Sequence, residues 1–527
     1  MVITMTYKSP SGVKRTRRRA DVKLAANTKR DEVYFKGRLR EPLAFREAIG
    51  ALHDVVISDL KWRPDPKKKA DYVKWRQEQL KKFNSEFFQL QRQYFEYLYK
   101  TDRNLWATLD PVITIHPDQI FFECFSKDES TYGRLAARQT MFEGVDELTA
   151  GTTNVDFSAS LYREMQGLRT YRQTDFTIDP GGIQMATEGR KDFTEKKIDL
   201  PESWIRGFLS VQSAMLLPRS VSFDVEPVDV FNVCTYLRRN RELIGPRGLR
   251  YELTPGEPVE IVLEPWDQRF VCKHSIYTGG EPRVIRTWGR RRIHLLERLL
   301  PLAKKFTVTL LGRGLPTFWH ADLGDMVFTL GLSGWTKNDW TGSTNFGLFF
   351  TQKSRTEREA TAAKALDLLK TRHRASLNDV AAGLNVDKDL ALDALKLQCH
   401  AGKVMYDFGD DVFRFRPVLR EDVALDTMLY RDPREKEALD LVENGKVSLG
   451  KVRKDDARRR LYVSAEVQEG GKTYHPELTF DFDGRLITAE SDDWFFKNNR
   501  LYQGPSTPIL AAKIAHERRQ SMEEFTD

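Results

Sequence analysis

The sequence is poor in cysteine and has no long apolar run. Its 527 residues include only four cysteines, which are too few and too far apart in the chain to form a disulfide framework. No stretch of about 18 apolar residues is present, so we expect no membrane span. The N-terminus also lacks the apolar core of a signal peptide. These absences predict a soluble protein of the cytoplasm without a membrane partner.

A strong excess of one charge is absent as well. The chain has 84 Lys and Arg against 76 Asp and Glu, a net charge of +8, which over this length is a mild lean towards polyanions. Hydrophobic residues make up 40% of the chain and aromatic residues 11%, and the length allows about three or four domains with their own cores. We expect a folded, multidomain α+β protein for which nucleic acid is a possible partner.

The first 40 residues are polar and basic. Their densest charge run contains Arg15, Arg17, Arg18 and Arg19. Such a run can neutralise phosphates and make binding salt-dependent, so these four arginines are candidate nucleic-acid contacts. A charged terminus is more often a solvated tail, and we expect residues 1–40 to be such a tail.

Residues 41–105 predict a helical hairpin. Apolar residues recur at spacings of three and four after Pro42, which suits the first turn of a helix. A second, longer apolar stripe extends over residues 67–100, beyond a proline-containing linker. Two such helices with a short connection are typical of an antiparallel pair.

Residues 106–350 change to period-two alternation with turn signals, which indicates a β-rich α+β region. Helical interruptions are expected at residues 202–216 and 293–302. The alternation does not reveal the order of the strands in space. The strand candidates are residues 119–125, 220–225, 259–263, 269–274, 305–311 and 325–330.

Several residues of this region have acid–base or metal-ligand side chains. Cys272 and His274 have the spacing of two metal ligands, but a structural zinc site usually needs four, so a half-buried strand is the better interpretation. His320, Asp322 and Asp325 lie close together in sequence without an identifiable nucleophile. We expect no enzyme activity, no metal, no cofactor and no small-molecule substrate. An enzyme of unknown class is the least favoured alternative.

The densest internal basic stretch surrounds a tryptophan. Arginine with an interleaved aromatic suits phosphate contact combined with base stacking, although such a stretch can also be a solvated face. Two further tryptophans, Trp335 and Trp340, are candidate partner-binding anchors, or plugs at the edge of the β region. The candidate nucleic-acid residues of the basic stretch are Arg286, Trp288, Arg290, Arg291 and Arg292.

Residues 355–420 predict three helices followed by a two-stranded hairpin. Ser376 precedes the second helix and Asp379 occupies its third position, a helix-start signature. This order looks like a winged helix-turn-helix, which usually suggests DNA. Negative residues are repelled by phosphates, and the third helix and the hairpin tip are rich in aspartate, so we expect this domain to dock protein. The aspartates are Asp387, Asp389, Asp393, Asp407, Asp410 and Asp411.

Residues 432–520 contain a small antiparallel sheet, an aromatic segment at 494–496, a loop and an apolar helix. This order resembles the SWIM zinc-finger family of bacterial type, whose pattern is C-x-C, a loop and C-x-H. The ligand positions fall on Ser491, Asp493, Ser506 and Pro508. Structural zinc requires thiolate or imidazole ligands, so the resemblance implies a degenerate finger without metal, held by an apolar frame that includes residues 494–496.

These patterns favour a non-enzymatic scaffold. Our leading hypothesis is a protein that contacts nucleic acid through its basic patches and other proteins through its C-terminal domains. The alternative is a purely protein-binding subunit of a larger assembly. Some bacterial proteins that the C-terminal segment resembles are encoded beside MoxR-type ATPases and VWA-domain proteins, which the resemblance implies as partners in that alternative.

Overall fold

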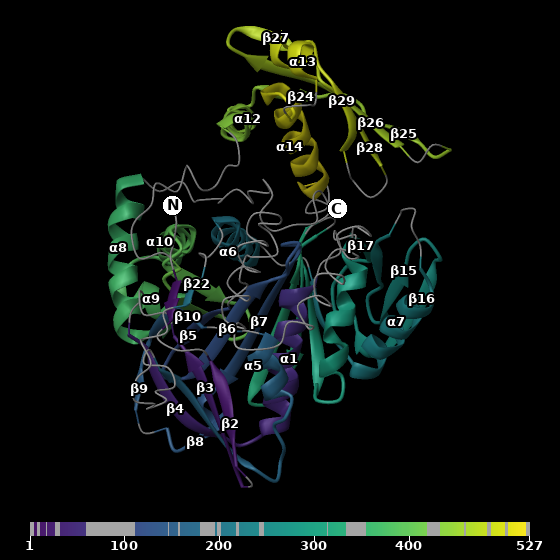
Figure 1. The fold of residues 1–527 in the computed structure, drawn as a ribbon. Coiled ribbons are helices and arrows are strands. Elements are labelled where there is room, and N and C mark those ends of the chain that lie inside the picture. Colours follow the sequence, from purple (N-terminus) through teal and green to yellow (C-terminus); the bar gives the residue numbers. More distant parts are fainter. Residues whose placement is uncertain are drawn as a thin grey trace, which may run out of the picture.

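The computed structural model has a mixed α+β, multidomain architecture (Figure 1), as the sequence predicts. No helix in the part of the chain that it describes has the length and apolarity to cross a bilayer. The second predicted helix, residues 67–100, lies outside the described residues, as do Arg17, Trp335 and Trp340. The described residues extend from 5 to 522, with gaps at 8–10, 17, 27–31, 59–110, 146, 156, 158, 180–194, 198–201, 218–220, 242–246, 313–314, 334–354, 419–432, 458–459, 482–485 and 501–503.

An eight-stranded antiparallel sheet forms the centre of the protein. Its strand order is β10-β5-β6-β7-β20-β19-β18-β13. Four of the strand predictions, those for β6, β13, β18 and β20, are confirmed to within about two residues. The bounds are β5 Val112–Ile115, β6 Gln119–Phe125, β7 Thr131–Arg138, β10 Gly151–Asn154, β13 Val221–Val225, β18 Lys305–Leu310, β19 Thr317–Asp322 and β20 Met326–Leu332.

Both faces of this sheet are covered. Strands β6 and β7 are almost entirely buried. Helix α1, Pro42–Ile57, packs against β7 and β6 on one face. On the other face, Trp204 and Phe208 of helix α6, Glu202–Met215, pack on Phe125. Polar side chains that point to either face of these strands must consequently find partners inside the protein.

The N-terminal residues belong to a second sheet and are not a solvated tail. Strand β3 pairs in parallel with β11 and antiparallel with β2, and its Val22 and Leu24 are buried. The tail prediction was wrong because alternating apolar residues directly follow the charge run and fit a half-buried strand. The strands are β2 Gly12–Arg15, β3 Arg19–Ala25, β4 Tyr34–Leu39, β8 Phe142–Glu143, β9 Leu148–Thr149 and β11 Gln173–Asp179.

A four-stranded antiparallel sheet, in the order β16-β15-β14-β17, lies beside β13 at the end of the central sheet. Helix α7, Pro227–Arg239, packs on its edge strand β16 and on the 3-10 helix η2, Arg290–Leu299. This 3-10 helix occupies most of the helical interruption predicted at 293–302. The strands are β14 Leu249–Leu253, β15 Pro258–Leu263, β16 Gln268–Ile276 and β17 Arg283–Thr287.

The three-helix module, residues 355–418, contains the helices and the hairpin that the sequence predicts. Ser376 Oγ accepts a hydrogen bond from the Asp379 backbone N–H, and the Asp379 carboxylate accepts one from the Ser376 N–H. A short strand, β21, adds to the hairpin. The elements are α8 Arg355–Arg372, β21 Arg374–Ala375, α9 Leu377–Leu384, α10 Lys388–His400, β22 Val404–Asp407 and β23 Val412–Phe415.

The C-terminal unit, residues 433–522, has its own apolar core (yellow in Figure 1). Its long strand β26 pairs with four shorter strands, and helix α14 packs on β26 and α12. The elements are α12 Pro433–Glu443, β24 Val447–Leu449, β25 Arg453–Asp455, β26 Arg460–Glu469, β27 Lys472–Tyr474, β28 Glu477–Asp481, β29 Leu486–Glu490, α13 Trp494–Asn499 and α14 Thr507–Met522.

Candidate functional site

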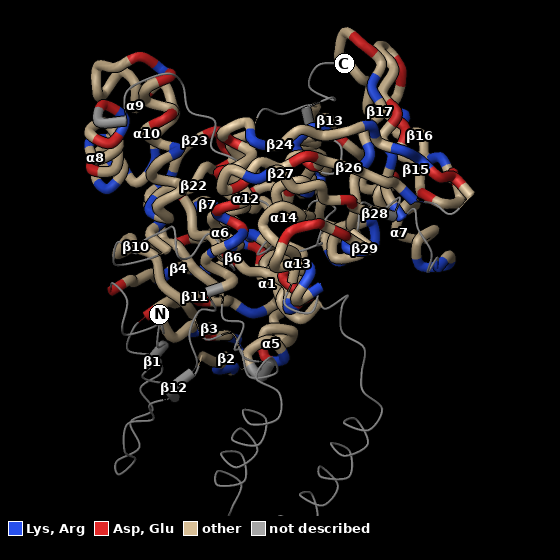
Figure 2. The backbone as a smooth tube through the Cα atoms, turned by 90° about the horizontal axis from the view of Figure 1, so that it is seen from above, with Lys and Arg blue, Asp and Glu red and all other residues tan. Residues whose placement is uncertain are grey.

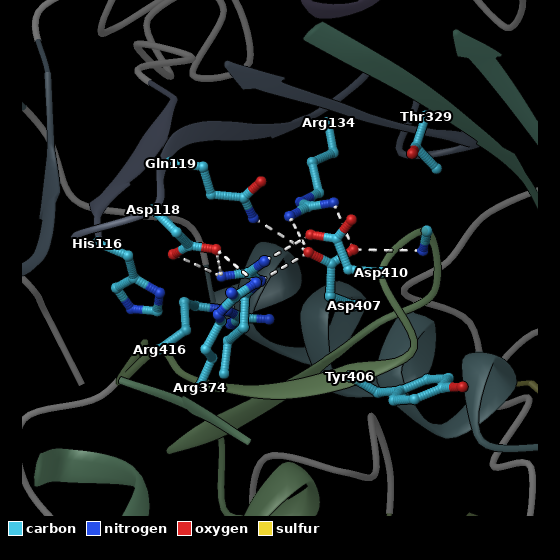
Figure 3. A network of polar contacts seen from close by, with 12 residues as sticks. His116, Asp118, Gln119, Arg134, Thr329, Arg374, Tyr406, Asp407, Asp410 and Arg416 are labelled. Atoms are coloured by element: carbon cyan, nitrogen blue, oxygen red, sulfur yellow. Dashed lines mark hydrogen bonds and ion pairs between the residues drawn. The ribbon is translucent and has the colours of Figure 1, made fainter. Parts of the chain in front are cut away.

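The hairpin β22–β23 is docked on the central sheet through a buried ionic network (Figure 3). Asp407 on β22 accepts two hydrogen bonds from the Arg134 guanidinium on β7, at 2.9 and 2.7 Å, and one from Arg414 Nε on β23 at 2.7 Å. Gln119 on β6 donates to the same carboxylate at 3.1 Å. The side chains of Asp407, Arg134 and Arg414 are 2%, 5% and 0% exposed, so the network is closed off from solvent.

Two guanidiniums balance this buried carboxylate. Burial opposes the ionisation of Asp407, but the charges and hydrogen bonds of Arg134 and Arg414 outweigh burial and hold its pKa well below the usual range. Arg414 also donates to Asp118, at 3.0 and 2.9 Å, and to Asp410 at the hairpin tip, at 2.6 Å. Removal of one partner would leave a buried charge uncompensated, which costs far more than the intact pair gains.

A second ion pair lies on the same face of the sheet. Arg416 Nε is 3.2 Å from the Glu123 carboxylate on β6, and Tyr132 donates its hydroxyl to Glu123 at 2.8 Å. Burial, followed by the charge of Glu123, raises the pKa of Tyr132 well above its ordinary value, so the phenol is a neutral donor. The Arg416 guanidinium also lies over the ring of Phe208 on α6, 5.0 Å from its centroid.

His116, directly after β5, connects the sheet to the end of β23. Its Nε2 is 2.8 Å from the Phe415 carbonyl oxygen, and because a carbonyl only accepts, Nε2 carries the hydrogen. Burial, reinforced by the positive charge of Arg414, lowers the pKa of His116 to about 3. The imidazole is therefore neutral at neutral pH.

The two elements that correspond to the DNA-contacting parts of a winged helix both have contacts inside this chain. The hairpin is held by the network, and α10 packs against α8, α9 and α6. Within α10, Lys388 and Asp389 of the first turn are exposed. This turn is the part of a recognition helix that contacts base edges, and here it carries one positive and one negative charge. The hairpin aspartates that argue against DNA binding thus have partners within the same chain.

The sheet side of this network was missed by the sequence analysis. Gln119 and Glu123 are four residues apart in the apolar strand β6, so their side chains point to the same face of the sheet. Arg134 interrupts the apolar strand β7. Charged residues inside buried strands need partners, and this signal indicates that a charged element covers the face. The identity of that element was not readable, because Arg134 and Asp407 are 273 residues apart.

The predicted basic patch around Trp288 is largely buried. Trp288, Arg290 and Arg292 are 5%, 2% and 5% exposed, and the Arg290 guanidinium lies over the ring of Trp266 at 4.6 Å from its centroid. In the helical part of the patch, Arg291 is exposed. A buried guanidinium cannot reach a phosphate and a buried indole cannot stack on a base. For these three residues the prediction was wrong, because the one-sided packing of η2 turns Arg290 and Arg292 inward. Phosphate contact by Arg291 stays a prediction.

The outer face of the four-stranded sheet carries an ion-pair network that includes Arg286, the first residue of that patch. Arg286 Nε donates to Glu264 at 2.7 Å. The carboxylates come from β14, from β15 and from the turn after β15, and the arginines come from β14, β16 and β17. Both charges are therefore mixed in this part of the molecule (Figure 2), and the face offers little net attraction for a polyanion. The network consists of Arg250, Arg269, Arg286, Glu252, Glu260, Glu264 and Asp267.

The N-terminal arginines lie at the turn between β2 and β3, where Arg15, Arg18 and Arg19 are exposed. Arg19 Nε is 2.5 Å from Asp175 and 3.1 Å from Asp21, which offsets its charge. Phosphate binding by Arg15 and Arg18 stays a prediction.

His320, Asp322 and Asp325 do not converge on one point. The His320 ring stacks on Phe408 of the hairpin, with centroids 5.5 Å apart. Asp322 accepts a backbone hydrogen bond within its own turn at 2.9 Å, and Asp325 accepts one from the Thr140 hydroxyl at 2.8 Å. Each side chain has a local structural role, and the three do not form an acid–base constellation.

Cys272 and His274 do not share a face of β16. The register of β16 against β15 shifts between Pro258 and Val259, and a bulge of this kind breaks the alternation of the strand. Cys272 is buried and His274 is exposed. Burial, followed by the charge of Asp229, raises the pKa of Cys272 to about 12, so this thiol is protonated.

Two of the four finger positions are joined by a hydrogen bond. Ser506 Oγ donates to Asp493 at 2.6 Å, and Asp493 caps α13 by accepting from the Phe496 N–H at 2.8 Å. Both Ser506 and Asp493 are buried, so this contact ties the start of α13 to the segment before α14. Phe496 is buried, but Trp494 is 74% exposed. The expectation that Trp494 belongs to the apolar frame was wrong, because the first residue after the cap faces outward.

A groove with a volume of about 740 Å³ lies between β13 and β16. Both are edge strands, since β13 ends the central sheet and β16 ends the four-stranded sheet. Ser222, His274 and Ile276 are among the residues of its walls. Helix α7, which directly follows β13 and packs on β16, exposes Val228 and Phe231 by 58% and 52%, and Ile276 is 48% exposed.

Comparisons with known proteins do not assign the chain to a family. The sequence matches no protein-family model and no curated protein. Among solved structures, the proliferating cellular nuclear antigen from Entamoeba histolytica is similar over 57% of this chain and 98% of that chain, with 9% sequence identity and a TM-score of 0.34. A likeness this distant carries no argument about function.

Proposed function

We propose that the protein is a non-enzymatic scaffold that binds other proteins, and that nucleic-acid binding is the lesser candidate. The observation that carries this proposal is the groove between two strand edges, whose wall includes the half-exposed Ile276. Val228 and Phe231 are exposed on helix α7, which packs on the same strand β16. Exposed apolar side chains on two neighbouring elements favour an interaction site. A strand edge can pair with an extended segment of another chain.

The partner that fits this groove is an extended protein segment that adds a strand to β13. Within the described residues, β13 pairs on one side alone, with β18. Strand addition would obtain its affinity from main-chain hydrogen bonds and its specificity from the side chains of the groove wall. The apolar side chains of α7 would contact the same segment or its flanks.

Nucleic-acid binding has weaker support from the geometry. The aromatic residue and two of the arginines in the predicted internal patch are buried, and the outer face of the four-stranded sheet mixes both charges. Arg15, Arg18 and Arg291 are the exposed cations on which this candidate depends. All four cysteines are buried and free, which fits a reducing compartment, and we place the protein in the cytoplasm.

Copurification with groove variants tests the proposal. The full chain, Phe231→Glu and Ile276→Glu would be recovered from cell extract at moderate salt, with Val452→Glu as the control, since Val452 is 42% exposed on the C-terminal unit. We expect the Ile276 variant in the groove wall and the Phe231 variant on α7 to lose a partner that the wild type and the control retain. A photo-reactive side chain at position 222 should cross-link to that partner.

Recovery of the same proteins with all variants would show that the groove is not the docking site. Salt-dependent binding of duplex or single-stranded nucleic acid by a chain that copurifies with no protein would favour the second candidate, because phosphate contacts weaken steeply with salt.

A further inference from the structure

Helices α7 and η2 bring three metal-ligating side chains together. The ligand atoms of Cys234 on α7 and of His294 and Glu297 on η2 all lie within 4.8 Å of one another. The cluster shares no residue with the hairpin network or with the walls of the groove.

The local backbone explains this convergence. In a 3-10 helix, residues i and i+3 lie directly above one another, so His294 and Glu297 share one side of η2, with His294 Nδ1 at 2.6 Å from Glu297 Oε1. Cys234 and Arg238 are four residues apart and share one face of α7. That face meets η2, where Cys234 Sγ is 3.8 Å from the Ile293 carbonyl oxygen and Arg238 is paired with Glu297 Oε2.

We propose that Cys234, His294 and Glu297 bind a zinc ion, with water as the fourth ligand. A thiolate, an imidazole and a carboxylate are the donor types that Zn²⁺ takes in proteins, and three protein ligands leave a tetrahedral position open. The side chains of His294 and Glu297 are 30% and 27% exposed, so water reaches the site. Arg238 would hold the second oxygen of Glu297, the orienting role of an outer-shell partner.

The arrangement requires little movement to accept the ion. Ligand atoms at about 2.0–2.3 Å from zinc lie about 3.3–3.8 Å from one another in a tetrahedral site. Small side-chain rotations would bring the thiol closer and move the His294 and Glu297 ligand atoms slightly apart. Without metal, Glu297 is paired with both Arg238 and His294. Cys234 keeps its proton until a metal displaces it.

Cobalt titration of the chelator-treated full chain tests this site. We expect about one Co²⁺ per chain, with a thiolate-to-cobalt charge-transfer band that Zn²⁺ removes by displacement. Cys234→Ser should abolish the band. His294→Gln should weaken binding by more than the 10–100-fold that loss of an outer-shell partner typically causes.

Cys399→Ser is the matched control, because Cys399 is an equally buried free thiol on α10. It should retain the band, and circular dichroism would establish that each variant is folded. A wild-type chain without a thiolate band would overturn the proposal, as would a band that survives in Cys234→Ser. If Cys234→Ser does not fold, unchanged cobalt affinity in His294→Gln would overturn the proposal instead.

Discussion

The protein builds two arginine–carboxylate networks from the same side-chain types in opposite surroundings. Under the hairpin, the side chains of Arg134 and Arg414 are 5% and 0% exposed. On the outer face of the four-stranded sheet, Arg250 and Arg269 are 24% and 46% exposed. Water and salt screen the outer pairs much more than the buried ones. A contact of the same length therefore carries very different energies in the two places.

The two networks also have different consequences for the fold. The buried one can satisfy its charges in one arrangement of hairpin and sheet, because any displacement leaves a charge without a partner. The outer one lies on strands that include the edge strand β16, where charged side chains discourage pairing with other chains. From this comparison we expect burial, and not residue type, to decide whether an ion pair specifies tertiary structure.

Removal of Asp407 should have the largest effect. Asp407→Ala leaves Arg134 and Arg414 buried without the carboxylate that they share, and we expect a loss of about 3–5 kcal/mol in the free energy of unfolding, measured by urea denaturation. Arg134→Met combined with Asp407→Ala should cost less than the sum of the two single changes. A loss below about 1 kcal/mol for Asp407→Ala would mean that the buried network stabilises the protein no more than exposed ion pairs do.

Acidification should destabilise the docked hairpin through His116. Its folded-state pKa, about 3, lies below the ordinary value of about 6.5, so the unfolded chain binds the proton more readily between these values and stability falls as the pH is lowered. From pH 7 to pH 4 we expect a loss of roughly 3 kcal/mol.

His116→Gln isolates this contribution. Asp407 has a depressed pKa, so its contribution is present above the ordinary carboxyl pKa and is lost only at lower pH. The glutamine variant should therefore show a flatter stability profile between pH 7 and pH 4. An unchanged profile would mean that His116 has the same pKa in the folded protein as in the unfolded chain.

Substitution of Asp493, one of the four predicted zinc-ligand positions, should have an effect on stability between those of the two networks. Asp493→Ala removes the cap of α13 and the hydrogen bond from Ser506, and we expect a loss of about 2 kcal/mol. Trp494→Ala is the neighbouring control, expected to change stability by less than about 0.5 kcal/mol because the side chain is exposed. Thermal unfolding distinguishes the two, and a larger effect of Trp494→Ala would contradict the observed packing.

Disruption of the outer network should have the smallest effect. Glu260→Ala removes a carboxylate 2.7 Å from Arg269, and we expect a loss below about 1 kcal/mol. That loss should shrink further at high salt, because exposed pairs are screened. A loss as large as that of Asp407→Ala would overturn the contrast between the networks.

Features produced by neighbouring residues were the most predictable. Helix α9 begins where Ser376 and Asp379 can cap it, and strands β6, β18 and β20 follow the alternation of apolar residues. Two of the failures have one cause. The inward turn of Arg290 and the outward turn of Trp494 depend on what covers each element, and a pattern of residue types does not contain that information.

The amino-acid sequence by itself determined the α+β class, the helices and hairpin of the three-helix module, and four of the eight central strands, because caps and periodicity act over a few residues. Only the tertiary structure decided that Asp407 meets Arg134 and that Cys234 meets Glu297. Those contacts join segments far apart in the chain. Their partners are chosen by which faces remain to be covered once each element has formed, and that choice is a property of the packed molecule.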